Sequence, residues 1–176
     1  LDLQHRDEVL ESYFEKINDS TIAGYRYSKA WATKQKIFFY TVFSQPIQKL
    51  HMAENELSKS FSSRLHFSFE FINQDKPILV RTGISGVDID GAKKNLLAEA
   101  SHTHFKTYVG QAKDLWDMEL AKIKVYGKQE EAKRVFYTAL YHCMISPNLF
   151  SDVDGRYRGR DDKIHSTEGK FNYYTV

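Results

Sequence analysis

The spacing of apolar residues changes at Val87 in this chain of 176 residues, and the change divides the sequence into a strand-forming part and a helix-forming part. In the first part, residues 65–71 alternate apolar and polar side chains. Such an alternation, with a period of two residues, is typical of a strand that buries one face. Segments 22–28, 36–43 and 78–85 are rich in β-branched and aromatic residues and are further predicted strands.

Polar segments separate these predicted strands, and short strands joined by polar loops favour a β-sandwich. The segment 52–63 is rich in Ser, Asn, Glu and Lys, so we expect an exposed loop or a short helix there. We therefore expect residues 1–98 to form part of a β-sandwich domain.

Beyond that part, the apolar residues recur every three to four positions, which indicates helices. Asp90 is a candidate cap for a short helix that ends at Glu99. Ser101 is a candidate cap for a longer amphipathic helix, which is followed by a strand-like stretch at 123–127. We expect residues 99–127 to form a helical linker.

A third helix is predicted at 129–145, where two glutamates favour the positive helix start and Pro147 stops the helix. From Val135 onward this helix is apolar nearly all round. A helix of that kind is buried on several sides, as it would be in the inner ring of a helical barrel. Residues 128–176 are therefore expected to begin a helical domain, and the expected fold class is α+β.

The charges are balanced, with 25 basic and 23 acidic residues and a net charge of +2. No run of five like charges occurs, so the sequence lacks the basic patch that nucleic acid or an anionic membrane surface requires. It also lacks a membrane-spanning apolar run. We expect neither nucleic acid nor a membrane as a partner. The single Cys143 rules out an internal disulfide and is expected to be a small core residue.

The segment 151–162 holds four aspartates and three arginines, so a calcium site has to be considered. The spacing is wrong for an EF-hand loop, because Gly155 is the fourth residue from Asp152 rather than the sixth. The interleaved arginines would also neutralise the carboxylates. Two interpretations remain: an Asx-turn in which Asp–Arg pairs fix the loop, or a wall that contacts a sugar. The candidates for such a wall are Asp152, Asp154 and Arg156.

Sequence patterns of a catalytic centre do not occur elsewhere. The seven histidines form no HExxH motif, and neither a nucleophile elbow nor a phosphate-binding or dinucleotide-binding loop is present. His142 and Cys143 are neighbours on the third predicted helix, where adjacent side chains diverge by about 100 degrees. They are therefore poorly placed for a nucleophile–base pair.

The sequence FYTALYHCMISPNLFSDVDGRYRG, at 136–159, resembles a signature of the glycoside hydrolase family 92 α-mannosidases. In that family an FYTALYH helix is followed by a loop of the form P-x-x-F-S-D-x-D-G-x-Y. Segments 24–31 and 38–46 resemble the late strands of the family's β-sandwich, and 83–100 resembles its passage into the helical linker. The resemblance covers most of 22–176.

This resemblance implies an N-terminal β-sandwich, linker helices and a C-terminal (α/α)6 barrel, with the active site between sandwich and barrel. Family members are calcium-dependent exo-α-mannosidases that invert the anomeric centre, so the implied partner is a mannose-containing glycan. Inversion is consistent with two carboxyl groups held far enough apart to admit a water. The parent protein is expected to be secreted or periplasmic.

In the family, the sequence that matches FNYYTV at 171–176 continues into a motif that contacts the sugar, and the acid, the base and the calcium ligands lie further on. We therefore expect no catalytic residue and no metal ligand in 1–176, and we expect the isolated chain neither to cleave mannosides nor to bind calcium. Asp152, Asp154 and Arg156 are expected to shape the cavity wall. The alternatives are a non-catalytic carbohydrate-binding β-sandwich module and a helical-barrel glycosidase of another specificity.

Overall fold

The structure is a computed structural model that describes residues 7–30, 32–52, 59–62, 67–72, 75–171 and 173–174. In chain order its elements are β1 (Glu8–Asn18), β2 (Thr21–Lys29), β3 (Gln35–Phe43), β4 (Ile47–Met52), β5 (Lys59–Ser62), β6 (Phe67–Phe71), β7 (Val80–Ser85), α1 (Ile89–Glu99), α2 (Phe105–Leu120), α3 (Glu130–Met144), β8 (Asn148–Leu149), β9 (Arg156–Arg158), β10 (Ile164–Ser166) and β11 (Tyr173–Tyr174). They fall into two compact units, Leu1–Ser101 with Ser151–Asn172 and His102–Phe150 with Tyr173–Val176.

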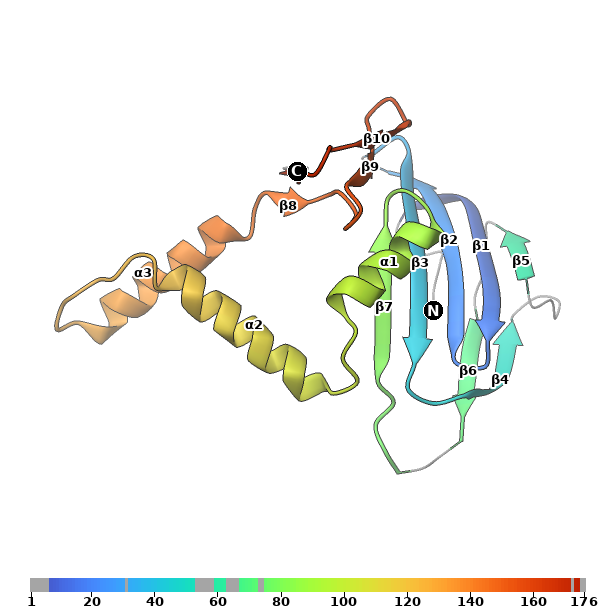
Figure 1. The fold of residues 1–176 in the computed structure, drawn as a ribbon, viewed down its shortest axis with the longest axis horizontal. Helices are drawn as coiled ribbons and strands as arrows, with labels where there is room; N and C mark the ends of the chain where they lie inside the picture. The colour runs from blue at the N-terminus through green and yellow to red at the C-terminus, as the bar shows by residue number, and fades with distance from the viewer. Residues whose placement is uncertain are drawn as a thin grey trace. The chain divides into compact units, whose positions relative to one another are not determined.

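The first unit is built on an antiparallel five-stranded sheet in the order β5-β1-β2-β3-β7 (Figure 1). Its register places Phe14, Gly24 and Phe39 directly opposite one another on neighbouring strands, so these residues share one face of the sheet. The other face carries Phe38 and Ser85, which are likewise paired across β3 and β7. A different layer covers each face.

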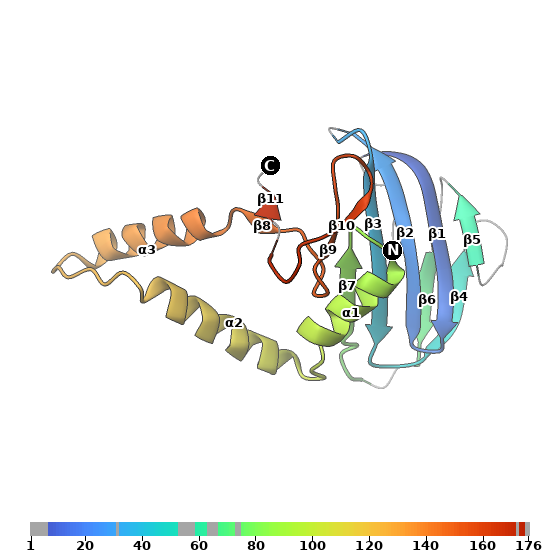
Figure 2. The ribbon, with the colours of Figure 1, turned by 45° about the horizontal axis from the view of Figure 1, so that its top comes forward.

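The face that carries Phe14 is covered by the two-stranded sheet of β4 and β6 (Figures 1 and 2). Phe14 is fully buried against Phe67 of β6, with ring centroids 4.1 Å apart. The core between the two layers consists of Phe14, Ile22, Phe39, Phe43, Ile47 and Phe67. Burial of an apolar side chain of this size stabilises a fold by about 1.5–3 kcal/mol. The predicted β-sandwich is confirmed.

Helix α1 covers the opposite face of the sheet, across β7 and β3 (Figures 1 and 2). It begins after Asp88, whose side chain accepts a hydrogen bond from the Gly91 N–H at 2.6 Å. The predicted cap was Asp90, which is wrong because Asp90 lies within the first turn. Gly83 of β7 allows the close approach of the helix, since a Cβ there would lie 2.1 Å from the Ala92 carbonyl oxygen.

The second unit contains α2 and α3, which contact each other through the rings of Trp116 and Tyr141, 4.6 Å apart between centroids. The Tyr137 hydroxyl also donates a hydrogen bond to the Ile123 carbonyl oxygen at 3.1 Å. Both helices lie wholly within the described residues, and neither contains a buried residue. In the part of the chain that the structure describes, no helix is both long and apolar enough to cross a lipid bilayer.

Large apolar side chains are exposed along both helices of this unit. Phe105 is 66% exposed, Leu115 is 60% exposed and Val135 is 64% exposed. The apolar residues that the sequence concentrates in α3 therefore find no core among the described residues. Apolar surface of this extent is typical of a face against which further protein packs.

Strands β2 and β3 confirm the segments predicted at 22–28 and 36–43, and β7 confirms the segment predicted at 78–85 from Val80 onward. Strand β6 confirms the prediction at 65–71 from Phe67 onward, and the two residues before it lie outside the described residues. These strands are recognisable in the sequence because β-branched and aromatic side chains are dense in them.

Strands β1, β4 and β5 were not predicted. In β1 the register shifts between Val9 and Glu11 and again between Lys16 and Asn18, and such bulges disrupt the alternation that marks a strand. Strand β5 lies within 52–63, so the prediction of a loop or a helix is wrong for Lys59–Ser62, and it is wrong for Met52 at the end of β4. Residues 53–58 and 63 fall outside the described residues.

Besides the cap of α1, three further predictions for the helical part need correction. Helix α2 begins after His104, which forms no side-chain capping bond, so the expected cap Ser101 is wrong. The strand-like stretch 123–127 forms no strand. Cys143 is exposed rather than buried, because α3 has no core to pack into within the described residues. The third helix itself is confirmed as α3.

Replacing Gly83 by alanine should force α1 away from β7, because the new Cβ would lie 2.1 Å from a backbone oxygen and 2.8 Å from the Leu96 backbone nitrogen. We expect Gly83→Ala to lower the free energy of unfolding by about 2 kcal/mol, measured by urea denaturation.

Gly110→Ala is the matched control, because nothing lies within 4 Å of a Cβ built at that position of α2. It should raise the free energy of unfolding by roughly 0.5–1 kcal/mol, since alanine is the better helix former. Equal effects of the two substitutions would contradict the close packing of α1 on β7.

Candidate functional site

The hairpin of β9 and β10 is distant in sequence from the sheet but belongs to the same compact unit. The segment that leads into it starts at Ser151, and its hydrogen bonds run to the end of β7 and to α1. We call this set of contacts the polar anchor. Its residues are Ser85, Asp88, Asn95, Asp152, Asp154, Arg156 and Arg158.

Asp152 is the buried centre of the polar anchor, with 4% of its surface exposed. Its Oδ2 accepts a hydrogen bond from the Ser85 hydroxyl at 2.6 Å, and its Oδ1 accepts one from the Asn95 side-chain amide at 2.8 Å. Burial raises the pKa of Asp152 above its ordinary value, although these two hydrogen bonds oppose the rise. Both carboxylate oxygens already have donors, so this side chain holds the loop in place.

Arg156 links the loop to the start of α1 through a bidentate contact with Asp88. Its Nη1 lies 2.6 Å from Asp88 Oδ2, and its Nη2 lies 3.3 Å from Asp88 Oδ1. The hydrogen bond from Arg156 holds the pKa of Asp88 below its ordinary value, and Asp88 in turn raises the pKa of Arg156. Since Asp88 also caps α1, one carboxylate joins the helix start to the hairpin.

Asp154 forms an Asx-turn, because its Oδ1 accepts a hydrogen bond from the Arg156 N–H at 3.2 Å. Its Oδ2 accepts a bond from Arg156 Nε at 2.9 Å and lies 3.2 Å from Lys94 Nζ. Partial burial acts to raise the pKa of Asp154, but the hydrogen bonds from Arg156 and Lys94 outweigh it and hold the pKa below its ordinary value. The loop is thus an Asx-turn fixed by Asp–Arg pairs.

Arg158 fastens the hairpin to the turn between β7 and α1. Its Nε donates to the Gly86 carbonyl oxygen at 2.8 Å and its Nη2 to the Val87 carbonyl oxygen at 3.0 Å. Its Nη1 lies 3.1 Å from Asp162 in the hairpin turn. Asp162 has a φ of 64°, a left-handed conformation that aspartate tolerates. A hydrogen bond from Lys36 of β3, 2.9 Å away, lowers the pKa of Asp162.

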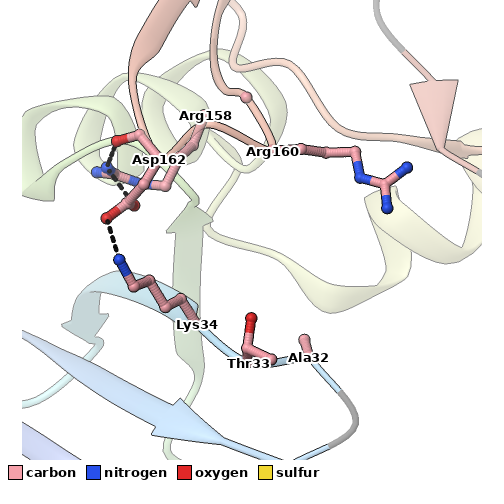
Figure 3. A pocket seen from close by; sticks show the side chains of 7 residues that line it. Ala32, Thr33, Lys34, Arg158, Arg160 and Asp162 are labelled. Atoms are coloured by element: carbon pink, nitrogen blue, oxygen red, sulfur yellow. Dashed lines mark hydrogen bonds and ion pairs between the residues drawn. The ribbon is translucent and has the colours of Figure 1, made fainter.

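A hollow of about 410 Å³ lies between the loop after β2 and the turn of the hairpin (Figure 3). It is lined by Ala32, Thr33, Lys34, Arg158, Gly159, Arg160 and Asp162. The three residues predicted as a cavity wall are not among these, and their function as a wall stays a prediction. The sequence did not predict the hollow, because its two sides are far apart in the chain. The one available signal was the density of charged residues in 151–162.

Among the described residues, no group of three or more His, Cys, Asp or Glu side chains could hold a metal ion. Among the aspartates of 151–162, Asp152 is buried and bonded to Ser85 and Asn95, whereas the other three have basic partners. Asp154 pairs with Arg156, and Asp162 pairs with Lys36 and Arg158. A hard cation needs carboxylates that are free of such partners, so these residues do not fit a calcium site.

Two family models match the chain. The N-terminal domain of glycosyl hydrolase family 92 matches residues 1–85, and the catalytic domain of the same family matches residues 91–176. The chain belongs to glycoside hydrolase family 92. None of the curated proteins matches it.

Solved structures of family 92 enzymes share the fold. The α-mannosidase BT3965 from Bacteroides thetaiotaomicron is 29% identical, with a TM-score of 0.87 over 98% of this chain and 25% of that chain. A further structure of BT3965 is a complex with mannoimidazole. The inverting mannosidase BT2199 from Bacteroides thetaiotaomicron VPI-5482 is 18% identical, with a TM-score of 0.81 over 98% of this chain and 24% of that chain, and shows likeness of fold alone. The chain thus spans about a quarter of the length of the solved enzymes that it matches.

The polar anchor connects residues that the two family 92 models assign to different domains. Ser85 is the last residue matched by the N-terminal domain, whereas Asp152 lies in the catalytic domain. Because of these contacts Ser151–Asn172 belongs to the same compact unit as the sheet, although it lies in the catalytic domain of the family models. Those models leave 86–90 between the two domains, and the expected division into 1–98, 99–127 and 128–176 stays a prediction.

Substitutions of Asp88 should distinguish its contribution to stability as a helix cap from its contribution through the ion pair with Arg156. Asp88→Asn keeps a side chain that caps helices about as well as aspartate does, but it removes the charge that faces Arg156. We expect it to lower the free energy of unfolding at neutral pH by up to about 1 kcal/mol, because the pair is partly exposed. Asp88→Ala also loses the cap and should cost about 1 kcal/mol more.

The effect of Asp88→Asn should depend on pH. Because the pKa of Asp88 is lowered in the folded state, its contribution is present above the ordinary value of 3.8 and is lost as the pH falls through the folded-state pKa. Urea denaturation from about pH 5 to about pH 3 should therefore show a shrinking difference between wild type and variant. Asp114→Asn, at an exposed position of α2, is the control and should show no difference. A constant difference for Asp88→Asn would contradict the ion pair.

Proposed function

We propose that the protein to which this chain belongs is an α-mannosidase that removes terminal mannose from mannose-containing glycans. The observation that carries the proposal is the match, in order, of the N-terminal and catalytic domains of family 92 to residues 1–85 and 91–176. The 29% identity to the α-mannosidase BT3965 over 98% of this chain, and the complex of that enzyme with mannoimidazole, support mannose as the sugar.

The proposed reaction is hydrolysis with inversion of the anomeric centre. Inversion needs an acid that protonates the leaving oxygen and a carboxylate that activates a water on the other face of the sugar, about 6.5–9.5 Å away. In the polar anchor, the carboxylates of Asp88, Asp152 and Asp154 already accept hydrogen bonds from neighbouring side chains. As the family resemblance implies, we propose that the acid and the base lie in parts of the enzyme outside this chain.

Calcium dependence is part of the proposal and rests on the family resemblance. Calcium takes about six to eight oxygen ligands from carboxylates, carbonyls and waters. The aspartates of 151–162 are poorly suited to such a site, because Asp154 and Asp162 are paired with arginine and lysine and both oxygens of Asp152 accept hydrogen bonds. The calcium ligands are proposed to lie outside these 176 residues, and the chain is proposed not to bind the ion.

Asp152, Asp154 and Arg156 are proposed to shape the wall of the substrate cavity. Asp152 is buried, so it would shape the wall indirectly, by fixing the loop to Ser85 and Asn95. Asp154 and Arg156 would face the sugar with the parts of their side chains that are exposed, 26% and 30% respectively. Export to the periplasm or the medium is proposed for the whole protein, as the family resemblance implies.

A non-catalytic carbohydrate-binding module is the alternative function. The match of residues 91–176 to a catalytic domain favours the enzyme over this module. A helical-barrel glycosidase with another sugar specificity is less well supported, because the 29% identical neighbour is an α-mannosidase.

The full-length protein should release mannose from an aryl α-mannoside. The first product seen by proton NMR should be β-mannose, because inversion of an α-linkage gives the β-anomer. A chelator should abolish the release and added calcium should restore it. The isolated 176-residue chain should release no mannose.

Three results would contradict this account, the first two in part and the third as a whole. α-Mannose as the first product would rule out inversion. Release of mannose by the isolated chain would show that the acid and the base lie within it. Absence of mannose release by the full-length protein, with folding confirmed by circular dichroism, would remove the proposal itself.

A further inference from the structure

Basic side chains gather around the hollow between the loop after β2 and the hairpin turn. Lys34 comes from the loop, and Arg158 and Arg160 come from the hairpin. Lys36 of β3 is bonded to the same turn. Among the described residues that line the hollow, Asp162 is the one acidic group. Four cations therefore lie around the hollow, and three of them, Lys34, Lys36 and Arg158, contact the one carboxylate.

The charge of Asp162 is already compensated by two of these cations. Lys36 Nζ lies 2.9 Å from its Oδ2, and Arg158 Nη1 lies 3.1 Å from its Oδ1. Lys34 Nζ is more distant, at 3.9 Å from Oδ2, and 68% of the Lys34 side chain is exposed. Because one carboxylate neutralises one charge, positive charge remains in excess at the Lys34 side of the hollow.

Arg160 adds a second uncompensated charge. Its side chain is exposed and makes no hydrogen bond or ion pair with any residue that the structure describes. Figure 3 shows its guanidinium well apart from the Asp162 carboxylate, with Thr33 and Ala32 along the lower side of the view. The hollow is thus bordered by Lys34, which shares the single carboxylate of Asp162 with Lys36 and Arg158, by Arg160 and by the hydroxyl of Thr33.

We propose that this hollow binds a sugar unit that carries an acidic group, such as a phosphate or a carboxylate. Its volume of about 410 Å³ lies within the range of about 300–1,000 Å³ that is typical of small-molecule sites and is sufficient for one substituted hexose. Lys34 and Arg160 attract the anion, and Thr33 supplies a hydrogen bond. Arg158 holds the hairpin side of the hollow through Gly86.

The choice of a sugar as the ligand rests on the proposed function, whereas the preference for an anion rests on the charges of the hollow. The hollow shares Arg158 with the polar anchor, whereas Thr33, Lys34 and Arg160 belong to the hollow alone. It would select glycans with acidic substituents without taking part in the cleavage of the mannosidic bond.

Isothermal titration calorimetry of the full-length protein with mannose 6-phosphate, mannuronate, mannose and inorganic phosphate tests the proposal. Wild type should bind at least one acidic sugar, and the affinity should fall by about fivefold for each charge removed in Lys34→Ala and Arg160→Ala. The affinity should also fall as salt is added. Lys170→Ala removes an exposed lysine outside the hollow and is the matched control, with unchanged affinity.

Equal binding of the acidic sugars by wild type and by the Lys34→Ala/Arg160→Ala double variant would overturn the proposal. Equal affinity of wild type for inorganic phosphate and for mannose 6-phosphate would overturn the choice of a sugar. The activity assay tests the proposed function separately, because Lys34 and Arg160 take no part in that reaction. If the protein binds acidic sugars but cleaves no mannoside, the proposed enzymatic activity is contradicted, whereas the proposed binding site is supported.

Discussion

The carboxylate of Asp88 joins two parts of the first unit, the start of α1 and the hairpin, and the position of the hairpin depends on it. It accepts a hydrogen bond from the Gly91 N–H at the start of α1, and it binds Arg156 of the hairpin in a bidentate contact. Helix α1 in turn lies directly on β7, because Gly83 presents no side chain to it. A carboxylate at a helix start is stabilised by the free N–H groups there, so α1 itself helps to orient the Asp88 side chain. Contacts with the sandwich and with α1 therefore determine the position of the hairpin.

A single partly exposed ion pair contributes little to stability, in general up to about 1 kcal/mol. The polar anchor is more than one pair, because Asp152 is buried and bonded to Ser85 and Asn95. Buried polar groups that are fully bonded specify one arrangement, since any other arrangement leaves a charge without partners. Side chains at the end of the N-terminal domain of family 92 therefore position a segment of the catalytic domain. This arrangement gives the sandwich a direct influence on the loop proposed to line the substrate cavity.

The sequence predicted the sandwich, the three helices and the family, but not the anchor. Dense β-branched and aromatic residues identify β2, β3 and β7, whereas the bulged β1 has no regular alternation. The charges of 151–162 correctly favoured an Asx-turn with Asp–Arg pairs. Their other partners could not be predicted, because Asp88 and Arg156 are 68 positions apart and no local pattern links them. The hollow was missed for the same reason, since no pattern in the sequence indicates that the loop of Lys34 lies near Asp162. Residue types indicate which groups need partners, and only the fold determines which partners they find.

Hydrogen exchange of the hairpin backbone tests most directly whether side-chain bonds hold it to the sandwich. The N–H groups of Asp152, Gly159 and Thr167 are hydrogen-bonded within the hairpin segment and report its opening. Arg158→Met removes the bonds to the turn between β7 and α1, and Arg160→Met removes an arginine of the same hairpin that makes no bond to the described residues. The account predicts exchange about tenfold faster in the Arg158→Met protein, because bonds from a charged donor are worth about 1.5–3 kcal/mol, and wild-type rates in the Arg160→Met protein. Equal rates in the two variants would contradict it.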